Sequence, residues 1–168
     1  MKKNTKLIKT LICVLAVSAL ALTGCGSDGN GEASADTAKI GADLLALDAD
    51  MPEVETVTSA SENADVSFAV LADFDYDKID SFYYSYSKSG SPEEIAVIAV
   101  KEKGDVADLM KALQAHIDSR RGTFEQYTPE KVSMVENAIL TYQGKVVLYA
   151  VSKKNGAMQD TFKQTVGQ

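Results

Sequence analysis

Residues 81–100 read SFYYSYSKSGSPEEIAVIAV and contain the clearest structural signal in the chain. Phe82, Tyr84 and Tyr86 alternate with Ser81, Tyr83, Ser85 and Ser87, which is the period of a strand with one apolar face. Residues 95–100 are continuously apolar, as expected for a strand that is covered on both sides or centrally placed. Residues 89–92, Ser-Gly-Ser-Pro, provide a turn between the two runs. The stretch therefore predicts a β-hairpin.

Helical and strand patterns follow this hairpin in the same order. Apolar residues from Val106 to Phe124 fall on one stripe at 3.6 periodicity, which predicts a long helix after an Asp105 N-cap. Residues 138–142 and 145–151 predict a second hairpin around Gln143-Gly144, and residues 157–166 predict a closing helix. Residues 40–47 predict a short helix, whereas residues 53–65 show no clear pattern.

The order is therefore strand, strand, helix, repeated once. This order predicts an α+β domain, with a mainly antiparallel sheet of about four strands and helices packed on one face.

The N-terminus has the pattern of an export signal. Four lysines within the first nine residues precede an apolar run from Thr10 to Leu22, which is too short to cross a bilayer comfortably. Leu22-Thr23-Gly24-Cys25 resembles the bacterial lipobox, in which the cysteine is lipidated and becomes the first mature residue. We therefore expect a signal peptide over residues 1–24 and a diacylglyceryl anchor on Cys25, in place of a plain signal peptide or an uncleaved anchor.

The residues after Cys25 divide into a tether and one domain. Residues 26–37 contain no large apolar side chain, so residues 25–37 are expected to form a lipidated flexible tether and residues 38–168 a single domain. Residues 25–168 hold 13 basic and 24 acidic residues, a formal net charge of −11. This charge disfavours nucleic acid and anionic lipid headgroups, so membrane attachment is expected through the acyl chains on Cys25.

Arg120 is placed on the apolar stripe of the long helix, where a guanidinium needs a partner. Glu125, Glu130 and Glu136 are candidates after the chain turns. The alternative is an aliphatic stem lying on the core with the charged head reaching solvent. Arg120→Leu is expected to change stability without changing localisation.

Two tyrosines complete the candidate binding residues. Tyr83 lies on the strand face opposite Phe82, where a tyrosine ring could contact a ligand, although such residues more often pack beneath a helix. Tyr127 lies at the end of the long helix. Together with Arg120 they define a candidate contact surface.

Catalytic and metal signatures are weak. Asp73, Asp75, Asp77 and Asp80 resemble the start of a calcium loop, but its glycine and final glutamate positions are Lys78 and Tyr84, so a solvated acidic loop is the preferred interpretation. His116 is the only histidine, and no motif supplies it with a nucleophile. We expect no cofactor, metal site or catalytic residue in the domain.

The chain resembles a bacterial lipoprotein family known as domain of unknown function 4358. The resemblance implies an extracytoplasmic lipoprotein but no established reaction or ligand. It is carried by Asp75-Tyr76-Asp77-Lys78-Ile79-Asp80, by Glu93-Glu94-Ile95-Ala96-Val97, by Arg120 with residues 123–130, by Val135-Glu136-Asn137-Ala138, and by the Gly144 hairpin.

The sequence favours a non-catalytic binding or interaction module, anchored on the extracytoplasmic face of the cell membrane, whose partner is an envelope protein or a small ligand. Two alternatives stay open. One is an envelope hydrolase or transferase that uses carboxylates such as Asp75, Asp77 and Glu125, and the other is a transporter accessory protein.

Overall fold

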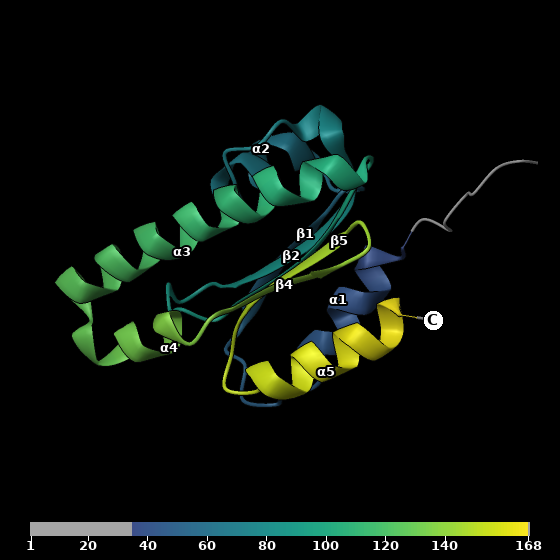
Figure 1. Cartoon of the computed structure of the whole chain (residues 1–168). Helices are drawn as coiled ribbons and strands as arrows, with labels where there is room; N and C mark the ends of the chain where they lie inside the picture. The colour runs from purple at the N-terminus through teal and green to yellow at the C-terminus, as the bar shows by residue number, and fades with distance from the viewer. Residues whose placement is uncertain (1–34, 168) are drawn as a thin grey trace, which may run out of the picture. The chain divides into compact units, whose positions relative to one another are not determined.

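The computed structural model describes residues 35–167, which fold around an antiparallel five-stranded sheet of order β1-β2-β3-β5-β4 (Figure 1). Every neighbouring pair is antiparallel. The fold class is therefore confirmed, with one strand more than predicted. The strands are β1 (Val54–Thr58), β2 (Ile79–Ser87), β3 (Glu94–Val100), β4 (Ile139–Gln143) and β5 (Val146–Val151).

Within residues 35–167, five α-helices and three short 3₁₀ turns accompany the strands. The α-helices are α1 (Thr37–Leu45), α2 (Ala64–Leu71), α3 (Val106–Tyr127), α4 (Val132–Glu136) and α5 (Asn155–Val166), and the 3₁₀ turns are η1 (Tyr76–Lys78), η2 (Lys103–Asp105) and η3 (Pro129–Lys131). Within residues 35–167, none of the helices has the length and apolar character needed to span a bilayer.

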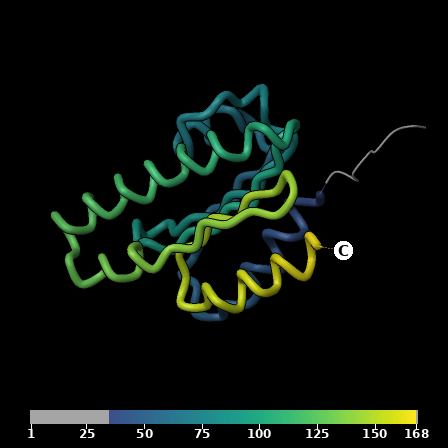
Figure 2. The backbone as a smooth tube through the Cα atoms, in the orientation of Figure 1, coloured from purple at the N-terminus to yellow at the C-terminus, as the bar shows by residue number. Residues whose placement is uncertain are grey.

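Helices cover both faces of the sheet, which corrects the prediction of one covered face. Ile95 and Val97 pack in a cluster with residues of α1 and α5, while Ala96 and Ile98 pack with residues of α2 and α3. Figure 2 shows the two layers, with α1 and α5 on one side of the strands and α2 and α3 on the other. The reason is the continuous apolar composition of β3 and β5, which leaves no polar face for solvent.

The additional strand, β1, lies at an edge of the sheet and pairs with β2. Only Val57 of its five residues is buried. An edge strand with a single buried side chain has no apolar alternation, so residues 53–65 gave no strand signal.

Asp105 does not cap α3 as predicted, because no amide of the first turn bonds its side chain. Its carboxylate instead accepts a hydrogen bond from Lys78 Nζ at 2.8 Å. This pair connects the start of α3 to η1.

Candidate functional site

Glu94 is a buried carboxylate on the central strand. It is the first residue of β3, and only 1 % of it is exposed. Glu94 has the same strand parity as Ala96 and Ile98, so its side chain points to the face covered by α3. Because an ionised carboxylate is costly to bury, it needs charged or hydrogen-bonding partners within the core.

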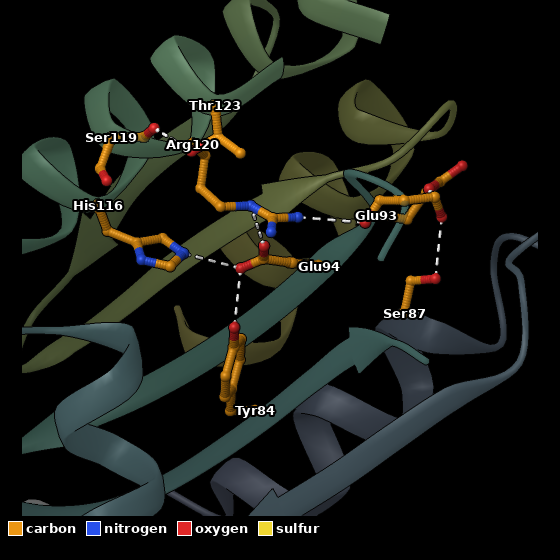
Figure 3. A network of polar contacts seen from close by, with 9 residues as sticks. Tyr84, Ser87, Glu93, Glu94, His116, Ser119, Arg120 and Thr123 are labelled. Atoms are coloured by element: carbon orange, nitrogen blue, oxygen red, sulfur yellow. Dashed lines mark hydrogen bonds and ion pairs between the residues drawn. The ribbon is translucent and has the colours of Figure 1, made fainter. Parts of the chain in front are cut away.

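Three side chains from two elements supply those partners (Figure 3). Arg120 Nε forms an ion pair with Glu94 Oε1 at 2.6 Å. His116 Nε2 lies 2.9 Å from Glu94 Oε2, and the Tyr84 hydroxyl donates to the same oxygen at 2.9 Å. We refer to Tyr84, Glu94, His116, Arg120 and Tyr149, described next, as the Glu94 cluster.

Tyr149 of β5 is the fifth member of the cluster. Its ring is fully buried and meets the His116 ring edge-to-face, with 5.7 Å between centroids. Its hydroxyl makes no hydrogen bond of ordinary geometry among the described residues. Burial and the nearby charge of Glu94 raise the pKa of Tyr149 well above its usual value. The same two causes raise the pKa of Tyr84.

Helix α3 positions two members of the cluster, His116 and Arg120. His116 and Arg120 are four residues apart, so they project from the same face of the helix. Arg120 also donates from Nη2 to the Ser91 carbonyl at 3.1 Å, and its guanidinium lies 5.0 Å from the Phe124 ring centroid. Arg120 therefore connects α3 to the turn between β2 and β3 through a hydrogen bond.

Stability should fall in alkali because Tyr84 and Tyr149 have raised pKa values. In the unfolded chain a tyrosine ionises near about pH 10, whereas both remain protonated in the fold above that pH. The unfolded state then loses protons first, so the stability present below about pH 10 is lost as pH rises further.

Urea unfolding at several alkaline pH values, with tyrosinate absorbance recorded in parallel, measures this effect. Tyr84→Phe should reduce the loss of stability at alkaline pH. This comparison separates the tyrosine contribution from that of three lysines, whose pKa values are also raised by hydrogen bonds to carboxylates: Lys39, Lys78 and Lys88. An unchanged alkaline slope in Tyr84→Phe would contradict the assignment.

The contact with Glu94 defines the tautomer of His116. An ionised carboxylate only accepts hydrogen bonds, so the imidazole nitrogen beside it, Nε2, carries the proton. In the neutral ring Nδ1 is then an acceptor. Figure 3 shows this second nitrogen turned away from Glu94.

A shallow groove of about 500 Å³ lies between α2 and α3, and His116 lines it. Small apolar side chains from both helices and the loop after α2 form much of its wall. Polar residues at its border include two acids and a lysine, namely Asp73, Asp108 and Lys111. The apolar wall is formed by Ala69, Ala72, Phe74, Ala112 and Ala115.

A larger hollow of about 860 Å³ lies at the opposite end of β3, beside Ala99 and Val100. Its other walls are the start of α1, the β4–β5 turn and the end of α5. No member of the Glu94 cluster lines this hollow, whereas His116 lines the α2–α3 groove.

A comparison with protein families matches residues 66–152 to the family described as Domain of unknown function (DUF4358). The chain belongs to this family. The DUF4358 match extends from α2 to β5 and contains every member of the Glu94 cluster. Comparisons with curated proteins and with solved structures found no match.

Within the DUF4358 region, Arg120 has the paired role that its position predicted, but the proposed partners Glu125, Glu130 and Glu136 are wrong. Its partner is Glu94, which lies 26 positions earlier in the chain. The sequence signal for it was the acidic pair Glu93-Glu94 at the start of an apolar strand.

The other predicted site residues lie apart from the cluster. Tyr83 faces away from Phe82 as predicted, but it is 4 % exposed beneath α1, and this leaves no surface for a ligand. Tyr127 is 80 % exposed at the end of α3. Cys25 and the tether before Ala35 lie outside the described residues.

The three acids considered for catalysis do not share a cleft. Asp75 caps η1 by accepting from the Asp77 amide at 3.0 Å, and the Lys78–Asp105 pair places η1 near the start of α3. Glu125 lies near the other end of this helix, which at 22 residues is about 30 Å long. Asp75 and Glu125 therefore do not share one site.

Proposed function

We propose that this protein is a lipid-anchored extracytoplasmic binding module, non-catalytic, whose ligand site is the α2–α3 groove. The lipobox at Leu22–Cys25 supports the anchor, and the net charge of −11 after residue 24 supports attachment by acyl chains in place of a basic surface. The groove supports a binding role because it is a concave surface lined by His116, a member of the Glu94 cluster.

The observation that carries the proposal is the way in which Glu94 holds His116. The carboxylate is inaccessible, so it does not itself meet a ligand. Its hydrogen bond orients the imidazole with Nδ1 turned away from Glu94, and His116 lines the groove. A buried carboxylate that orients a histidine in this way is a common means of presenting the second ring nitrogen.

The ligand chemistry follows from the groove walls. Alanines and Phe74 favour an apolar group, and Nδ1 of His116 favours a group that donates a hydrogen bond. Asp73 and Asp108 outnumber Lys111 at the border, which disfavours anions. We therefore assign the groove to a small apolar ligand, or apolar side chain of a partner, bearing an N–H or O–H donor.

The groove supplies no partner for a nucleophilic reaction at His116. The imidazole nitrogen that carries the proton bonds Glu94, and the site contains no hydroxyl or thiol hydrogen-bonded to the ring among the described residues. A serine or cysteine nucleophile would need such a bond to be activated. Binding is therefore the activity that this arrangement supports best.

Indole and 1-methylindole test the ligand assignment, because a methyl group replaces the N–H donor of indole in 1-methylindole. Indole should perturb the His116 ring resonances at millimolar concentration, and 1-methylindole should bind about threefold to tenfold more weakly through loss of one hydrogen bond. Ala115→Trp, which fills the groove, should abolish the perturbation, whereas Ala107→Trp on the exposed side of α3 should not. Failure of both probes to affect His116 would contradict the assignment.

Cys25→Ser tests the anchor. The variant should leave the membrane fraction or accumulate as an uncleaved precursor, because serine offers no thiolate for lipid transfer. Fractionation of cells with immunodetection of the chain measures this. A correctly processed Cys25→Ser chain that stays in the membrane would overturn the anchor.

A further inference from the structure

The edge strand β4 carries no charged side chain. Its residues read Ile-Leu-Thr-Tyr-Gln, and Tyr142 is 55 % exposed. The opposite edge, β1, contains Glu55 and follows Glu53, which pairs with Lys88 at 2.8 Å. Charges of this kind prevent an edge from pairing with another chain, and β4 lacks them.

The β4–β5 turn determines which backbone groups of β4 face outward. Gln143 opposes Val146 across the two-residue loop Gly144-Lys145, and Gly144 has φ +59°. The two residues that flank such a loop form backbone hydrogen bonds with each other. Along each strand, the backbone N–H and C=O groups of successive residues point alternately to one neighbouring strand and to the other side. The Lys145 carbonyl accepts from Val100 of β3 at 3.0 Å, which agrees with this alternation.

Residues 139, 141 and 143 therefore direct their backbone groups toward β5. The N–H and C=O groups of Leu140 and Tyr142 point away from the sheet. No other segment of residues 35–167 pairs with this row, and an edge of this kind is a template for another strand.

We propose that β4 pairs with β4 of a second copy of this chain, antiparallel and about a two-fold axis at Thr141. In this register Leu140 bonds Tyr142 of the partner subunit, and Tyr142 bonds Leu140 of the partner subunit. All four outward groups of each β4 are then satisfied by one arrangement. The interface is closed, because the same strand is used on both copies.

The side chains agree with this register. Leu140 would lie opposite Tyr142 of the partner subunit, and Thr141 opposite Thr141 of the partner subunit, which are favourable aromatic–aliphatic and threonine–threonine pairs. A second copy is the occupant that we select because the pairing is self-complementary. In addition, an uncharged strand lets two chains of net charge −11 approach without like charges facing each other.

Cross-linking of the full chain in intact cells tests the pairing. The central Thr141 pair is non-hydrogen-bonded, so its Cα atoms would lie about 4.5 Å apart, within disulfide range. With a mild thiol oxidant, Thr141→Cys should form a homodimer. Thr56→Cys on the exposed β1 edge should not, and neither should the parent chain, in which Cys13 is expected to leave with the signal peptide and Cys25 to be lipidated.

A charge-complementation experiment uses the same position without a disulfide. Differently tagged Thr141→Lys chains should fail to co-purify from detergent-solubilised membranes, as should two Thr141→Glu chains. A Thr141→Lys chain co-expressed with a Thr141→Glu chain should co-purify, because opposite charges would then face each other.

Three results would overturn the proposal. These are equal cross-linking through Thr141→Cys and Thr56→Cys, cross-linking of Thr141→Cys to a protein of another size, and co-purification unaffected by charge.

Discussion

Arg120→Leu should lower the free energy of unfolding by about 3 kcal/mol, because it leaves the buried Glu94 carboxylate without its ion-pair partner. Breaking a buried pair costs more than the pair contributes, since the remaining charge stays in the core. The expected cost lies at the lower end of the range for breaking a buried ion pair, because 27 % of the Arg120 side chain is exposed. Urea unfolding monitored by circular dichroism measures the change.

Arg121→Leu is the matched control. Its side chain is 49 % exposed, and it lies 3.7 Å from Glu125, so its loss should change stability by less than about 0.5 kcal/mol. The double variant Arg120→Leu with Glu94→Leu should be less destabilised than the sum of the two single variants, because no unpaired charge remains. Additive effects would mean that the two residues are not energetically coupled.

Gly41→Ala should lower the free energy of unfolding by about 2 kcal/mol, although alanine is normally the better helix former. A Cβ at this position of α1 would lie 2.1 Å from Cδ1 of the buried Tyr83 ring. The ring is covered by the helix and cannot move into solvent, so the clash outweighs the gain in helix propensity. Thermal and chemical unfolding measure the difference.

Two comparisons separate this clash from an ordinary helix effect. Gly122→Ala in α3 meets nothing within 4 Å, so it should stabilise the protein by up to about 1 kcal/mol. In a Tyr83→Ala background, Gly41→Ala should become neutral or stabilising because the ring is absent. A stabilising Gly41→Ala in the parent chain would contradict the packing of Tyr83 beneath α1.

Periodicity predicted the parts of the fold in which each side chain has a defined burial. The alternation in β2, the apolar runs of β3 and β5 and the stripe of α3 each led to the correct element, because local burial and local sequence agree there. The edge strand β1 was missed since one buried residue, Val57, gives no period. The continuous runs also implied helices on both faces, which the prediction of one covered face did not take into account.

The candidate site was predictable only in part, because its members come from four elements. The helical wheel indicated that Arg120 needed a partner, but spacing along one helix cannot show which strand residue faces it. The sequence therefore indicated acids close to Arg120 along the chain, such as Glu125, and not Glu94. His116 gave no signal of its own, since its role depends on the orientation of β3 beneath α3.

The tautomer of His116 tests the central claim most directly, because the claim is that Glu94 orients the imidazole and leaves Nδ1 open to the groove. As the chain has a single histidine, long-range proton–nitrogen correlation spectra of the ¹⁵N-labelled protein give an unambiguous assignment. The neutral ring should carry its proton on Nε2, and Glu94→Leu should remove this preference. A ring protonated on Nδ1, or one whose tautomer is unaffected by Glu94→Leu, would contradict the account.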